Sequence, residues 1–177
     1  MTDKDHLILT ATGPDHLGLV EKISEFISIR GCNIEDSKMA VFCGEFAVIV
    51  LISGESGSLE KMAKEYRDLE TETRLSVSIK IPSIRKAAEF LLPYRLTASS
   101  MDHPGIVYRI SGILRGLGVN IESMETKTYS APVSGTPLFQ LEADVAVPAR
   151  TNINELRNRL SDLQREENID IELKLPS

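Results

Sequence analysis

The chain has 177 residues, of which 42% are hydrophobic and 26% are charged, as in a globular protein of one medium or two small domains. Its 20 basic and 26 acidic side chains give a net charge of −6, which argues against non-specific binding to nucleic acids or anionic membranes. No apolar run approaches the roughly 20 residues of a transmembrane helix. The N-terminal residues lack the basic and apolar regions of a signal peptide, so we expect a cytoplasmic protein.

The hydrophobic pattern of the first half predicts six elements, in the order strand, helix, strand, strand, helix, strand. Apolar and β-branched residues mark the strands, and each helix carries apolar residues on one face. We expect strands at residues 7–12, 32–42, 46–52 and 75–81, and helical stripes at 19–27 and 59–69. This order is typical of the ferredoxin-like βαββαβ unit, an antiparallel four-stranded sheet with two helices on one face.

The second half repeats the first at an offset of 87 residues. The stretch Asp15-His16-Leu17-Gly18 recurs as Asp102-His103-Pro104-Gly105, and Gly31-Cys32-Asn33-Ile34 recurs as Gly118-Val119-Asn120-Ile121. A matched spacing of this kind indicates an internal duplication. The hairpin near residues 130–137 is longer than its counterpart in the first half.

We therefore predict an α+β protein of two tandem βαββαβ units. The first domain covers residues 1–82, a linker covers 83–93, and the second domain covers 94–177. Within the linker, residues 84–92 have helical spacing, although the stretch from Phe90 equally suits the start of a strand.

The repeated loop is the first candidate site, because in each copy an expected strand ends, a glycine follows and a helix begins. The first amides of a helix lack intrahelical partners and carry the positive end of its dipole, which favours a bound carboxylate or phosphate. Gly18 and Gly105 leave room to reach those amides. The alternative is that each glycine only permits close packing of helix on sheet. Asp15 and Asp102 are expected to cap the two helices.

Two asparagines at the expected starts of matched strands are the second candidates. The amide of Asn33 or Asn120 can bond the carboxylate or ammonium group of a ligand. Asparagine is equally favoured as a turn residue after a helix-ending glycine, so both interpretations stay open.

The remaining motifs do not favour catalysis. His16 and His103 each follow an aspartate, but sequence neighbours rarely have the geometry of a catalytic dyad, and we interpret them as loop-packing residues. We expect no catalytic residue, metal site or cofactor, and no direct contact with nucleic acid, because nucleophile, metal, phosphate-loop and RNA-binding motifs are missing. Cys32 and Cys43 lie near the two ends of one expected strand, too far apart for a disulfide, and should be free thiols.

The duplicated βαββαβ order, the stretch from Asp102 to Val107 and the two Gly-x-Asn-Ile stretches together resemble a tandem ACT-domain protein. The resemblance covers nearly the whole chain and is strongest to the group of glycine cleavage system transcriptional repressors. It implies a non-enzymatic, homo-oligomeric regulator that senses an amino acid, glycine being one candidate. Such a regulator acts through a partner protein such as a DNA-binding regulator.

The resemblance also implies where a ligand binds, namely near the loop glycine and the strand-start asparagine, commonly between ACT units packed side by side. Carried over to this sequence, the implied ligand-binding residues are Asp15, His16, Leu17, Gly18 and Asn33, and Asp102, His103, Pro104, Gly105 and Asn120. Leu17 stands where the family usually has the proline that the second copy keeps, which makes the second loop the stronger candidate. The alternatives are a subunit that regulates a metabolic enzyme directly and a structural module whose sheet edges mediate assembly.

Overall fold

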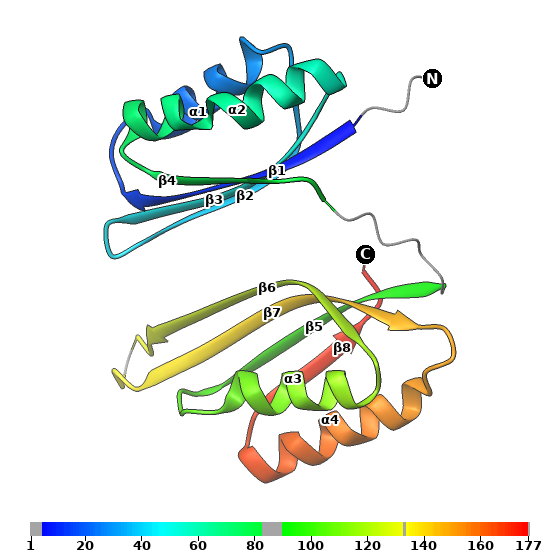
Figure 1. Cartoon of the computed structure of the whole chain (residues 1–177). Helices are drawn as coiled ribbons and strands as arrows, with labels where there is room; N and C mark the ends of the chain where they lie inside the picture. Colours follow the sequence, from blue (N-terminus) through cyan, green and yellow to red (C-terminus); the bar gives the residue numbers. More distant parts are fainter. Residues whose placement is uncertain (1–4, 83–89, 133, 177) are drawn as a thin grey trace. The chain divides into compact units, whose positions relative to one another are not determined.

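The chain divides into two compact units, Met1–Arg85 and Lys86–Ser177 (Figure 1). The computed structural model describes residues 5–82, 90–132 and 134–176. Most of the segment predicted to be a linker or a short helix therefore lies outside the described residues. The first strand of the second unit begins at Leu91, inside the predicted linker.

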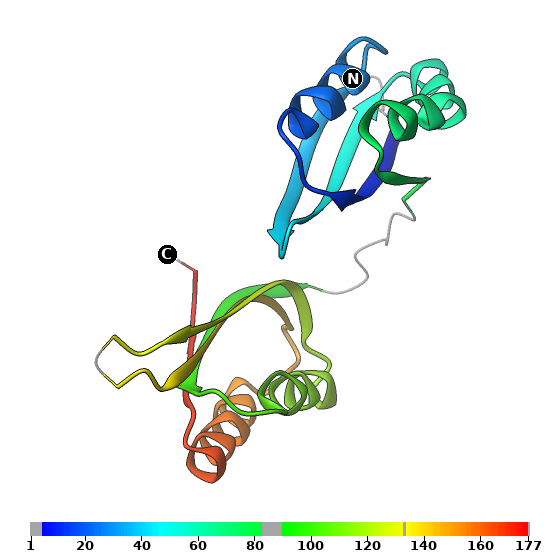
Figure 2. The same ribbon diagram turned by 90° about the vertical axis from the view of Figure 1, so that its left-hand side faces the viewer.

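The first unit is a four-stranded antiparallel sheet covered on one face by two helices (Figure 2). Its elements are β1 (Asp5–Pro14), α1 (Leu19–Ser28), β2 (Asn33–Phe42), β3 (Glu45–Gly54), α2 (Ser56–Thr73) and β4 (Ser76–Lys80). The strand order is β2-β3-β1-β4, so β1 and β3 are central and β2 is an edge. This arrangement confirms the predicted βαββαβ fold.

The second unit has the same topology, with strand order β6-β7-β5-β8. Its elements are β5 (Leu91–Met101), α3 (Ile106–Gly116), β6 (Asn120–Ser130), β7 (Pro137–Pro148), α4 (Ile153–Glu167) and β8 (Asp170–Lys174). Residues 131–136 connect β6 to β7, whereas only Cys43 and Gly44 connect β2 to β3. The longer second hairpin is thus confirmed.

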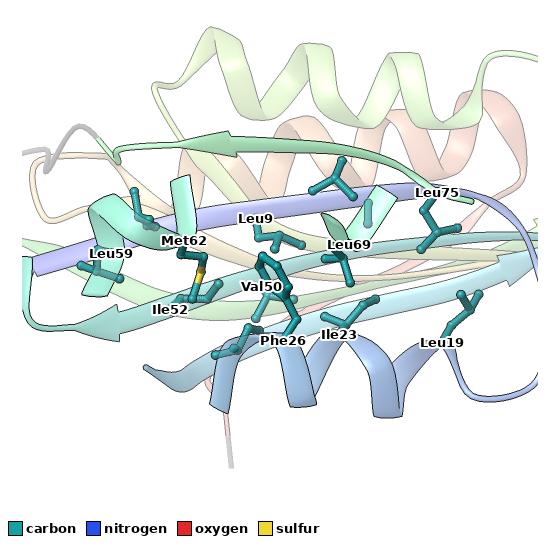
Figure 3. Close-up of a cluster of buried hydrophobic side chains, with 14 of the residues drawn as sticks. Leu9, Leu19, Ile23, Phe26, Val50, Ile52, Leu59, Met62, Leu69 and Leu75 are labelled. Atoms are coloured by element: carbon teal, nitrogen blue, oxygen red, sulfur yellow. The ribbon is translucent and has the colours of Figure 1, made fainter. Parts of the chain in front are cut away.

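Each unit buries its own apolar core between the sheet and the two helices. In the first unit, Leu9 and Ile52 of the sheet meet Phe26 of α1 and Met62 and Leu69 of α2 (Figure 3). Burial of such side chains stabilises a fold by about 1.5–3 kcal/mol each. The predicted helical stripes are confirmed except at Val20, Ala63 and Val107, which are exposed.

Val20 and Val107, which the sequence pattern places on the buried faces of α1 and α3, are exposed. Each follows the buried residue that opens its helix, and because a helix rotates by about 100° per residue, its side chain points away from the sheet.

The two cysteines are free, as predicted, because β2 separates them. Cys43 and Gly44 form the β2–β3 turn with positive φ angles of 52° and 83°, the geometry of a type I′ hairpin turn. Cys32 is half-buried, and this burial raises the pKa of its thiol above the ordinary value, while the nearby Arg30 cation opposes the shift.

Arg30 clamps the end of α1 to α2. Its side chain is only 9% exposed, and its Nε donates a 2.9 Å hydrogen bond to Glu65 Oε2. The Nη1 group donates to the carbonyl of Phe26 at 3.0 Å, and the guanidinium lies 3.6 Å from the centroid of the Phe26 ring. One cation therefore satisfies acceptors on both helices of the first unit.

We predict that Arg30→Ala lowers the free energy of unfolding of the first unit by about 2 kcal/mol, since it leaves a carboxylate and a carbonyl without their charged donor. Urea denaturation of the full chain measures the change. Arg159→Ala is the matched control, because Arg159 pairs with Glu155 on an exposed helix face and should change stability by no more than about 0.5 kcal/mol. Equal losses of stability in the two variants would show that the Arg30 contacts stabilise the chain no more than an exposed ion pair does.

Candidate functional site

The loop glycines begin the first helix of each unit. Gly18 and Gly105 are the N-caps of α1 and α3, with left-handed φ angles of 92° and 103°. A Cβ placed on Gly105 would meet nothing within 4 Å, and one on Gly18 would meet only the Glu21 carboxylate at 4.0 Å. Close packing therefore does not explain these glycines. The backbone conformation explains them instead, because residues other than glycine rarely adopt so positive a φ angle.

Asp15 and Asp102 do not cap the helices, contrary to the prediction. The strands β1 and β5 run on to Pro14 and Met101, so each aspartate lies three residues before the true N-cap. Their backbone amides instead anchor the loops: Asp15 N–H donates to the carbonyl of Gly44 at 2.8 Å, and Asp102 N–H to that of Pro137 at 2.9 Å. Both carboxylate-bearing residues are exposed.

In the first unit, His16 ties the loop to the C-terminal end of α2. Its Nε2 donates to the carbonyl of Thr73 at 3.0 Å, and Lys22 Nζ donates to the neighbouring carbonyl of Glu72 at 3.0 Å. The last carbonyls of a helix lack intrahelical donors, so both contacts cap α2. The histidine has the packing and capping role that the sequence favoured. Leu17, the next residue, is fully exposed.

In the second unit, the loop histidine and a basic residue of the first helix contact side-chain carboxylates of the second helix, where the first unit uses backbone carbonyls. His103 Nε2 lies 3.8 Å from Glu167 Oε2 at the end of α4. Arg109, which corresponds to Lys22, pairs with Glu167 and lies 3.0 Å from Glu166 Oε2. In this unit the loop is therefore joined to the second helix by a network of four charged or titratable groups.

A single unit does not bring its loop glycine and its asparagine together. Asn33 lies opposite Ser53, which in turn lies opposite His6 at the start of β1. The loop leaves the other end of β1, where Pro14 lies opposite Glu45. Eight residues of extended strand separate the two positions, which is about 26 Å.

The same separation holds in the second unit. Asn120 lies opposite Ala146, which pairs with Pro93, whereas the loop follows Met101. Gly105 and Asn120 of one unit consequently cannot contact one amino-acid-sized ligand. Both asparagines are exposed at the start of an edge strand.

The third residue of the first helix distinguishes the two loops, and sequence reasoning missed it. In α1 this residue is Glu21, whose carboxylate lies back over the helix start near Gly18. An acid at this position compensates the dipole and the free amides of the helix. In α3 the corresponding residue is Tyr108, which is 80% exposed, and the first turn carries no acid. The offset of 87 residues aligns the two and would have revealed the difference.

No group of three or more His, Cys, Asp or Glu side chains that could hold a metal ion occurs among residues 5–82, 90–132 and 134–176. Over these same ranges no helix is both long enough and apolar enough to cross a membrane.

The fold, with a left-handed glycine at the first helix start of each unit, is that of two tandem ferredoxin-like βαββαβ units. Residues 5–80, which form the first unit, match the family model of the ACT domain. The chain is also related to glycine cleavage system transcriptional repressors. Those of Escherichia coli and Shigella flexneri are each 24% identical to it over 149 residues, which cover 84% of this chain and 78% of the repressor.

Two crystal structures share the whole two-unit fold. A protein of unknown function from Galdieria sulphuraria is 27% identical with a TM-score of 0.82, and the match covers 99% of this chain and 100% of that one. A protein provisionally assigned as a glycine cleavage system transcriptional repressor is 21% identical with a TM-score of 0.67, and the match covers 98% of each chain. The tandem arrangement is therefore shared along the full length.

We predict that Gly105→Ala destabilises the chain by about 1 kcal/mol although the site is open, because alanine is strained at this positive φ. Gly112→Ala in the same helix is the control: its Cβ also meets nothing within 4 Å, but its φ is not positive. That change should stabilise the chain by about 0.5–1 kcal/mol. Urea denaturation compares the two, and a neutral or stabilising Gly105→Ala would refute the conformational argument.

Proposed function

We propose that this chain is a non-enzymatic regulator that binds an amino acid at the start of α3 and signals through contacts with a partner protein. The observation that carries the proposal is the open, uncapped start of α3, where Gly105 is left-handed and no acid occupies the first turn. The ACT-domain match of the first unit and the similarity to named transcriptional repressors support a regulatory role.

The loop offers chemistry that suits both ends of an amino acid. The free amides at the start of α3 and the exposed Tyr108 hydroxyl are donors for a carboxylate. The exposed Asp102 carboxylate has the sign that an ammonium group requires. Pro104, also exposed, fixes the backbone that precedes the glycine.

The first loop is the weaker ligand site, because the Glu21 carboxylate already lies over the start of α1 and would repel a ligand carboxylate. The first loop residues Asp15, His16, Leu17 and Gly18 then serve mainly to connect β1 to α1. Asn120 and Asn33 lie too far from the loop of their own unit, so either asparagine joins a ligand site only together with the loop of another unit.

The partner class follows from charge and from the relatives. A net charge of −6 opposes direct binding to DNA, which favours action through a DNA-binding protein in the cytoplasm. Glycine is the first amino acid to test, because the similar proteins are named as repressors of the glycine cleavage system.

Calorimetric titration of the full chain against the twenty amino acids tests the proposal. We expect binding of at least one, and Tyr108→Glu should weaken it at least about tenfold by placing an acid where α1 has Glu21. The exchange should not unfold the chain, because an acid in the first turn favours the helix.

Glu21→Tyr is the matched control and should not weaken binding, because it removes an acid from the first loop and leaves the second loop unchanged. No heat with any amino acid, in a folded sample, would overturn ligand binding. An equal loss of affinity in Glu21→Tyr would overturn the assignment to the second loop.

A further inference from the structure

The sheet of the first unit has a second face, which its own helices do not cover. Both α1 and α2 lie on one face of this sheet, and no helix within residues 5–82 lies over the opposite face, which we call the outer face (Figure 2). Side chains alternate along a strand, so the residues between the core residues of β1 and β3 point to the outer face. On these two central strands they are Ile8, Thr10, Thr12, Ala47, Ile49 and Leu51.

The centre of the outer face is an apolar strip made of Ile8, Leu51, Ile49 and Ala47. Ile8 lies opposite Leu51, and Ile49 and Ala47 follow along β3. These residues alternate with core residues of the same strands, and the side chain of Ile49 is 46% exposed. Residues of the first unit therefore leave the strip uncovered.

The second unit has charged or polar residues at all four positions of the strip. The strand registers align Ile8 with Arg95, Leu51 with Asp144, Ile49 with Glu142 and Ala47 with Gln140. Arg95 donates hydrogen bonds of 3.0 and 2.9 Å to Asp144 Oδ1, so these charges satisfy each other on the second sheet. The fold therefore does not require apolar residues at these positions, and their presence in the first unit indicates an interaction surface.

The apolar strip has the size of the apolar stripe of one short helix. It is two strands wide, and the four residues from Ala47 to Leu51 extend over about 13 Å of strand. A helix is about 10 Å in diameter and covers this length with about nine residues. A helix on the outer face would repeat the packing that the opposite face of the same sheet makes with α1 and α2.

Lysine side chains flank the strip on both sides. Lys38 of β2 lies opposite Ile49, and Lys80 of β4 lies opposite Ile8, and both lysines are exposed. Asp36, also on β2, offsets part of this positive charge. Because the whole chain has a net charge of −6, two lysines beside an apolar strip make this face the complement of an apolar stripe with acidic neighbours.

We propose that the outer face of the first sheet docks an amphipathic helix of a partner protein, with acidic side chains beside Lys38 and Lys80. A single short helix on this strip buries much less than the roughly 1,200–2,000 Å² of a stable interface, so the contact is weak and reversible. The inference rests on the proposed action through a partner protein and names its contact surface. It does not depend on ligand binding at the start of α3.

Fluorescence anisotropy of two labelled helical peptides, titrated with the full chain, tests the proposal. Both probes carry the same stripe of leucine and alanine over three turns, flanked by glutamates in one peptide and by lysines in the other. We expect the glutamate peptide to bind with a dissociation constant of about 10–100 μM, and the lysine peptide to bind at least about tenfold more weakly.

Ile49→Glu gives the first sheet the residue that the second sheet has at this position, and should weaken binding of the glutamate peptide at least about tenfold. Lys80→Glu should weaken it in the same direction by reversing a flanking charge. Glu142→Gln is the matched control, because it also changes one charge on an outer face, but in the second unit, and should leave the affinity unchanged. Circular dichroism confirms that each variant is folded.

Three outcomes would overturn the proposal: no binding of the glutamate peptide, equal affinity for both peptides, or undiminished binding to Ile49→Glu. Sedimentation equilibrium adds a fourth, since a loss of self-association in Ile49→Glu would assign the outer face to a second copy of the chain. Calorimetry with amino acids reads out the start of α3 separately. Failure of the peptide to bind a chain that still binds an amino acid would therefore reject the docking surface alone.

Discussion

The antiparallel register of the central strands determines where every candidate residue lies. Because β1 is hydrogen-bonded between β3 and β4 and its apolar face packs on the helices, the chain leaves β1 at one end of the sheet, returns along α1 and starts β2 at the other end. Gly18 and Asn33 are separated for this reason, and the same register separates Gly105 from Asn120. A site that combines the two motifs therefore needs two copies of the fold.

Periodicity predicted the elements well, since alternation in the strands and the stripe in each helix reflect burial against a single layer. The cap assignments failed at Asp15 and Asp102 because a local signal, an acid after a strand, could not show that the sheet extends further and postpones the helix start. The sequence pattern also could not reveal the distance from Gly105 to Asn120, because this distance depends on the register of strands that are far apart in the sequence. Tyr108 was missed because an exposed aromatic residue carries no motif by itself.

The two duplicated units have similar apolar cores but different surfaces. Both units bury apolar residues at matched positions of the sheet and helices, as stability of each half requires. The helix starts and the sheet edges differ instead: Glu21 corresponds to Tyr108, and Met39 and Val41 correspond to threonines. The two units therefore differ at the first helix start and at the sheet edge rather than in their cores.

In each unit, side-chain contacts connect the loop before the first helix, or that helix itself, to the end of the second helix. In the second unit these contacts connect the proposed ligand site at the start of α3 to the end of α4. In the first unit this link runs to backbone carbonyls, which stay fixed as long as α2 is folded. In the second unit it runs to Glu166 and Glu167, whose side chains can exchange partners. If an amino acid binds at the start of α3 as proposed, its carboxylate would compete with these two acids for the Arg109 cation. Binding at the loop would therefore loosen the end of α4, and a partner protein that contacts this end would sense the change.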